Sequence, residues 1–171
     1  FFGANDLPVE SPLDVQATIA LKQFADISAN WSLLGGVSFA TGPNGTGHDN
    51  RTDVWGVDAF LKYRPITEAS TTQVTLQTEW LLRRRQVPHA LLSDISGYAQ
   101  ATWRFAKRWG AGARYEYGST STAIDGVGID DLDPAWTKGR ARYSGALTFW
   151  ATEFSRMRWQ VSVDRPAWLS Q

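Results

Sequence analysis

The residues of this chain with the clearest capacity for chemistry are basic side chains on the polar side of alternating segments. Three pairs are spaced by two residues: 83 and 85, 140 and 142, and 156 and 158. Residues two apart in an extended strand share a face, and a ring of basic groups can select anions in a pore. The full set is Lys62, Arg64, Arg83, Arg85, Arg104, Arg114, Arg140, Arg142, Arg156 and Arg158.

Acidic residues fall on the same side of these segments. They are Asp14, Asp58, Glu79, Glu116 and Asp164. The arginine fork suits a carboxylate as well as a phosphate, and opposite charges on neighbouring strands stabilise a sheet. Two interpretations therefore stay open: an anion-binding channel lining, or ion pairs that stiffen a wall. We expect Glu79 and Glu116 to lie at heights where they can pair with arginine.

Enzymatic and metal chemistry have little support in the sequence. His48 and His89 fall in predicted loops, without a serine and an acid at the spacing of an acyl-transfer triad. A glycine-containing loop with Asp130, Asp131 and Asp133 has the oxygen ligands that calcium prefers, but its spacing does not fit an EF-hand. We predict a solvated acidic loop, no cofactor and no enzyme activity.

The composition narrows the class of protein. The 17 basic and 17 acidic residues balance, whereas a nucleic-acid-binding domain normally has a basic excess, so no nucleic-acid partner is expected. The chain has nine tryptophans and no cysteine, and no apolar run approaches the ~18 residues that a spanning helix needs. A chain that is rich in aromatic residues but has no long apolar run has the composition typical of a membrane β-barrel.

Period-two alternation predicts one all-β domain over residues 1–171, an antiparallel up-and-down transmembrane barrel. The expected strands are 11 to 15 residues long, enough for the ~9–11 that a tilted strand needs to cross a bilayer. They cover residues 13–24, 30–41, 52–64, 72–86, 95–106, 108–118, 139–151 and 155–165.

Aromatic residues cluster at the ends of the apolar sides of these strands. Trp31 and Phe39, and Trp55 and Tyr63, are examples. This arrangement predicts two aromatic girdles around an apolar band. A soluble β-sandwich or lipocalin-like barrel shares the alternation, but its large aromatics would more often lie mid-strand.

The predicted connections alternate in length. The long ones cover residues 41–53, 86–96 and 118–139. Since outer-membrane barrels have short periplasmic turns and longer outside loops, the first strand is expected to run inward. Both ends of the chain would then lie outside, so we expect about eight strands of a larger barrel, such as a 16-stranded one.

Four stretches resemble a known porin group: WGVDAFLKYRP, LQTEWLLRRRQ, GYAQATWRFAKRWGAGARYEY and RYSGALTFWATEFSRMRWQVSVDR. They are similar to the carboxyl-terminal half of barrels related to the phosphate-selective porins, often labelled zinc-regulated TonB-dependent outer-membrane proteins. The resemblance covers most of residues 13–165. The TonB label implies an amino-terminal plug, but nothing in this chain resembles one.

The sequence thus leads to three functional hypotheses. The first is a porin-like channel for small solutes, anions among them, in the bacterial outer membrane. The second is a structural barrel that anchors a larger envelope complex, and the third is a soluble β-barrel binding protein. Expected partners of a membrane barrel are lipid, lipopolysaccharide, and further copies of the chain or an envelope complex.

Overall fold

In a computed structural model, the described residues, 15–47, 49–67, 71–123 and 139–165, form nine β-strands and no helix. The strands are β1 (Ala17–Ser28), β2 (Trp31–Pro43), β3 (Arg51–Tyr63), β4 (Gln73–Val87), β5 (Ala90–Ala106), β6 (Trp109–Gly118), β7 (Thr122–Ala123), β8 (Arg140–Trp150) and β9 (Arg156–Arg165). No described segment is a helix long and apolar enough to cross a membrane.

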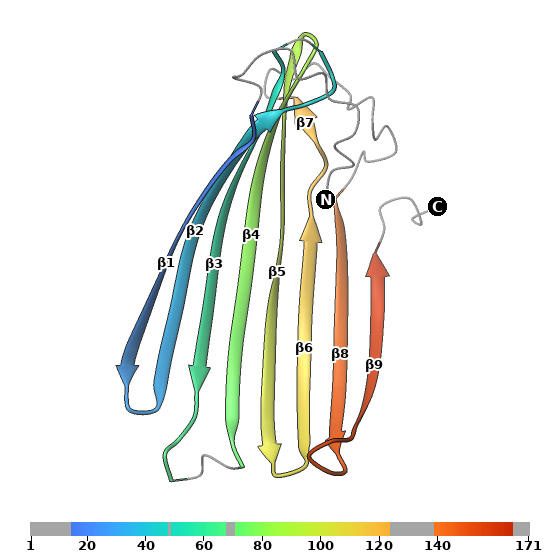
Figure 1. Cartoon of the computed structure of the whole chain (residues 1–171). Coiled ribbons are helices and arrows are strands. Elements are labelled where there is room, and N and C mark those ends of the chain that lie inside the picture. The colour runs from blue at the N-terminus through green and yellow to red at the C-terminus, as the bar shows by residue number, and fades with distance from the viewer. Residues whose placement is uncertain (1–14, 48, 68–70, 124–138, 166–171) are drawn as a thin grey trace.

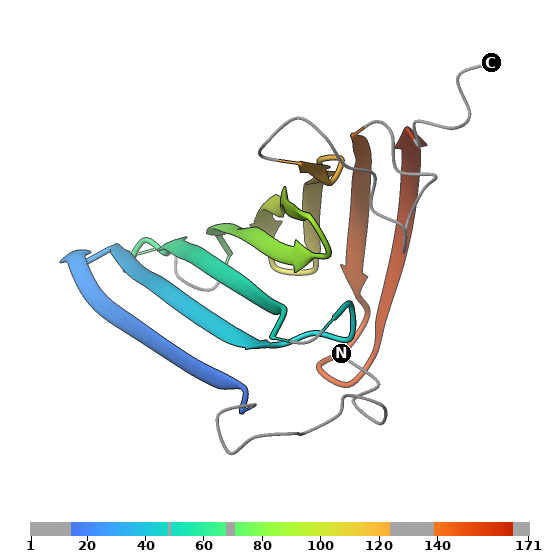
Figure 2. The ribbon, with the colours of Figure 1, turned by 90° about the horizontal axis from the view of Figure 1, so that it is seen from above.

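The strands form one antiparallel sheet in up-and-down order. Each long strand pairs with the next along the chain, from β1 to β6 and then β8 and β9, while the two-residue β7 pairs with β5. The all-β class and this order are confirmed. Viewed from above, the sheet is an open trough with β1 and β9 at its edges (Figures 1 and 2).

The register between strands is nearly continuous. The longest regular ladder joins β4 and β5 from Gln73↔Arg104 to Val87↔Ala90 without a shift. The two register shifts lie beside hairpin turns, at Asp26/Ser28 and Arg104/Ala106. Because paired residues share a face of the sheet, each row of partners can be followed on one face across the strands.

The connection between β4 and β5 differs from the sequence prediction. Residues 86–96 were expected to form a long loop, but the strands continue to a turn at Pro88 and His89. Proline followed by a residue with positive φ, 70° at His89, is the pattern of a type II turn. The residues Ala90–Asp94 pair with Arg83–Val87, so the predicted start of this strand at residue 95 is wrong.

The first strand is also displaced along the chain. It was expected over residues 13–24, yet β1 runs from Ala17 to Ser28, because positions 24–28 pair with the start of β2. Leu13 and Asp14 lie outside the described residues. The other predicted strand ends fall within two residues of the observed ones.

The sheet has almost no buried interior. Leu92 is the fully buried large side chain among the described residues. The chain exposes 12276 Å², whereas a compact soluble protein of 19.0 kDa would expose about 8,400 Å². The described residues therefore form a single layer whose two faces are both open to their surroundings.

Candidate functional site

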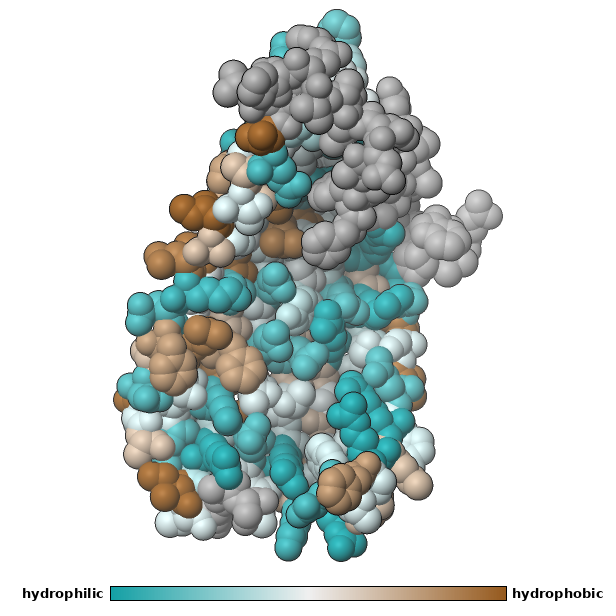
Figure 3. Space-filling view, viewed as in Figure 1, coloured by the Kyte–Doolittle hydropathy of each residue, from teal (hydrophilic) through white to brown (hydrophobic). Residues whose placement is uncertain are grey.

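One face of the sheet carries most of the ionisable side chains and is called here the charged face. It lines the inside of the trough, and Figure 3 looks onto it, with hydrophilic residues gathered over its middle and lower parts. A single row of partners crosses this face at mid-height. Its members are Lys22, Gly36, Asp58, Glu79, Tyr98, Glu116, Arg142 and Asp164.

An ion pair at the β1 end of this row bridges an intervening strand. Lys22 Nζ lies 3.3 Å from Asp58 Oδ1, although Gly36 of β2 stands between them in the register. A Cβ on Gly36 would collide with the Asp58 carboxylate. The absence of a side chain at this position therefore gives the carboxylate the space in which it meets the lysine.

Two arginines of the predicted set pair with carboxylates on the neighbouring strand. Arg142 Nε and Nη2 donate to the Asp164 carboxylate at 2.5 and 3.1 Å. Arg83 Nε and Nη2 both donate to Asp94 Oδ2, at 2.9 and 2.6 Å. Asp94 was not among the predicted pore-lining acids, because it falls in the segment expected to be a loop.

Arg114 makes three kinds of contact at the middle of the charged face. Its Nη2 lies 2.9 Å from Glu116 Oε1, its Nη1 donates to Gln100 Oε1 at 3.3 Å, and its Cζ lies 3.9 Å from the centre of the Tyr98 ring. These contacts fix the guanidinium from several sides. Glu116 thus pairs with an arginine, but with one on its own strand and not across neighbouring strands as expected.

Glu79 does not behave as expected. Its partners in the register are Asp58 and Tyr98, and no described arginine or lysine forms an ion pair with it. The spacing along β4 correctly placed Glu79 on the charged face. Its neighbours on that face depend on the register of β4 with β3 and β5. The expected pairing with arginine is therefore not found.

The remaining predicted basic residues are of three kinds. Arg104 Nη2 donates to the Lys107 carbonyl at 2.6 Å, and its Cζ lies 5.1 Å from the centre of the Trp150 ring. Three others also have interaction partners: Arg64, Arg85 and Arg140. Within the described part of the chain, three form no ion pair: Lys62, Arg156 and Arg158.

A small hollow of about 60 Å³ lies on the charged face between β5, β6, β8 and β9. Its floor includes Gly112 and Ala146, which are partners in the register. Arg114 lies one row above them and Arg158 one row below. Hydrogen-bonding side chains complete the lining: Gln100, Thr102, Ser144 and Gln160.

The chemistry of this hollow suits a small anion. Arg158 can point its donors at an oxyanion above a floor without side-chain bulk. Arg114 borders the same space, with its guanidinium already bonded to Glu116 and Gln100. The sequence indicated Arg114 and Arg158 but not the glutamines or the small floor residues. Only the register shows that Gly112 and Ala146 open a space between the two arginines.

The opposite face is apolar and bordered by aromatic contacts. Ring centres lie 4.7 Å apart for Trp31 and Tyr63 at the lower end and 5.2 Å apart for Phe39 and Trp55 at the upper end. Eight residues separate Trp31 from Phe39 along β2, about 26 Å in an extended strand. The same two borders continue on the later strands, where Trp109 contacts Phe149 and Tyr115 contacts Tyr143.

Two polar side chains within this apolar face are hydrogen-bonded. Trp80 Nε1 donates to Thr78 Oγ1 at 2.8 Å, and Thr78 Oγ1 donates to the Tyr98 carbonyl at 2.8 Å. At the upper end, Arg84 Cζ lies 5.2 Å from the centre of the Trp55 ring. This face therefore presents few unsatisfied polar atoms, as a surface that contacts hydrocarbon requires.

The other candidates from the sequence are the two histidines and the acidic loop. His89 lies at the β4–β5 turn, far along the strand from the mid-height charged row. No group of three or more potential metal ligands occurs among the residues that the structure describes. His48, Asp130, Asp131 and Asp133 lie outside those residues.

The fold and its two faces define an up-and-down antiparallel β-sheet protein with one charged side and one apolar side. The chain is similar to a curated protein of Aquifex aeolicus (strain VF5), described as an uncharacterized protein, with 31% identity over 164 residues. The match covers 85% of this chain, which spans 33% of that relative's length. No family model and no solved structure matches the chain.

Proposed function

We propose that this chain forms part of the wall of a transmembrane β-barrel in the bacterial outer membrane. The observation that carries the proposal is the contrast between the faces: an uncovered apolar face bordered by aromatic residues lies behind a charged one. Apolar side chains on this face are exposed: Val57 is 53% accessible and Leu21 is 69% accessible. An exposed apolar face of this kind is suited to contact with lipid.

The dimensions of the sheet agree with this placement. The eight long strands have 10 to 17 residues, against the ~9–11 required to cross a bilayer. An apolar band about 26 Å long, tilted by roughly 40°, is about 20 Å tall, close to the ~25 Å typical of outer-membrane barrels. The edges β1 and β9 would need further strands, because backbone groups in hydrocarbon must be paired.

The charged face would then line the aqueous interior and conduct small solutes, anions among them. The hollow between Arg114 and Arg158 supports a preference for anions, since both guanidinium groups border one open space. Arg156 lies two residues before Arg158, on the same face of β9. Neither forms an ion pair with a carboxylate in the described ranges, so both remain available to a permeating anion.

Planar-bilayer recordings of the full-length protein in a potassium chloride gradient test this function. We expect channels whose reversal potential lies nearer to the chloride equilibrium potential than to the potassium equilibrium potential. In Arg158→Gln the reversal potential should shift toward the potassium equilibrium potential. The control is Arg84→Gln, which removes the same charge from the apolar face and should leave the reversal potential unchanged. Absence of channels, or a cation preference in the unmodified protein, would reject the anion-conducting function.

A structural barrel that anchors an envelope complex is the second candidate. The observation in its favour is that several charges neutralise one another across strands, as in Arg83–Asp94 and Arg142–Asp164. A protein that requires detergent for extraction and shows heat-modifiable gel mobility, yet forms no channels, would fit this role. A soluble binding protein is the third hypothesis, and a detergent-free soluble monomer would support it and reject the membrane placement.

A further inference from the structure

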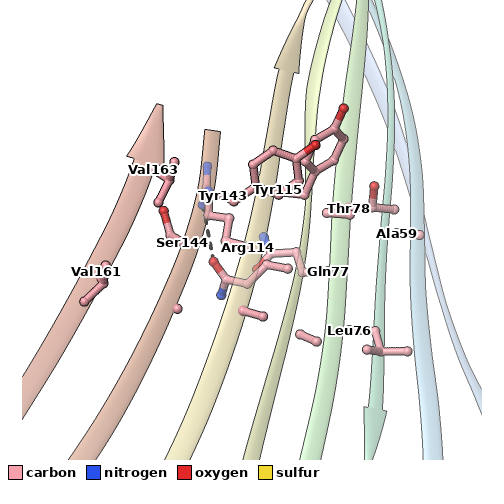
Figure 4. A pocket seen from close by; sticks show the side chains of 15 residues that line it. Ala59, Leu76, Gln77, Thr78, Arg114, Tyr115, Tyr143, Ser144, Val161 and Val163 are labelled. Carbon is pink, nitrogen blue, oxygen red and sulfur yellow. Dashed lines mark hydrogen bonds between the residues drawn. The ribbon is translucent and has the colours of Figure 1, made fainter. Parts of the chain in front are cut away.

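The apolar face contains a broad groove of about 780 Å³ at mid-height. Figure 4 shows it from the side opposite to Figure 3, with Tyr115 and Tyr143 at one end and Leu76 and Val161 toward the other. Its floor is formed by small residues of two adjacent rows: Ala59, Thr78, Ala99, Ala101, Ala113 and Gly145. The groove volume lies in the range of ligand sites, about 300–1,000 Å³.

The lining of the groove determines the chemistry of its occupant. Alanine and glycine at the floor, with Leu76, Val161 and Val163 at the sides, present carbon almost throughout. The Thr78 hydroxyl in the floor is already bonded to the Tyr98 carbonyl and to Trp80 Nε1. Over this floor an occupant gains burial of apolar surface, which fits a hydrocarbon chain. Four polar residues of the charged face also border the groove: Gln77, Gln100, Arg114 and Ser144.

A basic residue stands beyond the tyrosine end of the groove. Val163, which lines it, pairs with Tyr143, and the next pair on the same face is Arg165 with Ala141. Two residues along a strand correspond to about 7 Å. Arg165 is exposed and forms no ion pair within the described part of the chain, so its guanidinium is available to a phosphate.

We propose that this groove binds one acyl chain of an anionic membrane lipid, whose headgroup phosphate contacts Arg165. The inference rests on the proposed membrane placement of the sheet and adds a specific lipid site to it. Apolar floor, tyrosine pair and arginine follow one another in the order of a lipid's tail, interface and headgroup. Amphipathic tyrosine is suited to the middle position.

Two substitutions separate the tail site from the headgroup site. In Gly145→Leu, the new side chain enters the groove, because an added Cβ there meets no atom within 4 Å. Gly35→Leu is its matched control: Gly35 lies on the same face, also has open space around its Cβ, and does not line the groove. Arg165→Gln removes the headgroup contact, with Arg84→Gln as the control for charge on this face.

The test is native mass spectrometry of the full-length protein extracted from vesicles of equal parts phosphatidylglycerol and phosphatidylcholine. We expect one retained phosphatidylglycerol, about tenfold less retention in Gly145→Leu, and wild-type retention in Gly35→Leu. Arg165→Gln should reduce the preference for phosphatidylglycerol about fivefold, since a basic residue near the membrane surface contributes about 1 kcal/mol.

Three results would overturn the proposal. Equal retention in Gly145→Leu and Gly35→Leu would remove the groove as the tail site, even in a protein that inserts normally. A change of oligomeric state in Gly145→Leu, without loss of lipid, would assign the groove to contact between copies of the chain. Failure of the unmodified protein to enter the vesicles would reject the membrane placement together with the lipid site.

Discussion

Gly35 and Gly36 are neighbours in β2, but they face opposite sides of the sheet and meet different surroundings. A Cβ on Gly35 would meet nothing within 4 Å on the apolar face, whereas a Cβ on Gly36 would collide with the Asp58 carboxylate on the charged face. Gly35 leaves the apolar face without a protruding side chain at its position. Gly36 leaves space for the ion pair between Lys22 and Asp58.

The two faces also differ in the bonds that their polar side chains form. On the apolar face, Trp80 Nε1 donates to Thr78 Oγ1 on the same strand, and Thr78 Oγ1 donates to the Tyr98 carbonyl on the neighbouring strand. Polar side chains on the charged face reach across strands, as Arg83 and Arg142 do. These bonds join uncharged groups on the apolar face and ions on the charged face. Satisfied uncharged groups suit a surface against hydrocarbon, while ion pairs suit a face on which water can still solvate the charges.

The largest effect is expected from a charge placed on the apolar face. Under the proposed membrane placement, Val57→Lys should reduce the stability of the protein by about 2–4 kcal/mol, because the ammonium would enter hydrocarbon. The measurement is urea unfolding in lipid vesicles, followed by heat-modifiable gel mobility. Gln77→Lys puts the same charge on the opposite face and should cost less than about 1 kcal/mol. Equal costs would show that the two faces do not have different surroundings.

The glycine pair gives an intermediate effect. Gly36→Ala should destabilise the protein by about 1–2 kcal/mol, because the Asp58 carboxylate must move away from Lys22. Gly35→Ala should be neutral, since its methyl group enters open space. The same unfolding measurement distinguishes them, and a smaller cost for Gly36→Ala than for Gly35→Ala would contradict the role assigned to this ion pair.

The smallest effect concerns two threonines on opposite faces. Thr78→Val should cost about 1 kcal/mol, because the Trp80 indole N–H loses its acceptor where water is excluded. Thr75→Val removes a hydroxyl that bonds to Thr102 on the charged face, where water can replace it. Its cost should be lower in the same assay. The blue shift of tryptophan emission provides a second readout for Thr78→Val.

The alternation of residue types was sufficient to predict the antiparallel up-and-down order and the face of most side chains. It failed where local signals were ambiguous. Pro88 and His89 were read as part of a long loop, although proline before a positive φ also makes a tight turn. Ala90–Asp94 could be recognised as strand only through their pairing with Arg83–Val87.

By itself, the sequence determined which side chains share a face, because the two-residue period of a strand is a local property. Only the tertiary structure decided which residues are neighbours on that face. The register leaves Glu79 beside Asp58 and Tyr98, and it sets Arg114 and Arg158 around Gly112 and Ala146. The physical reason is that register depends on the relative height of strands, which hairpin turns and cross-strand contacts fix together.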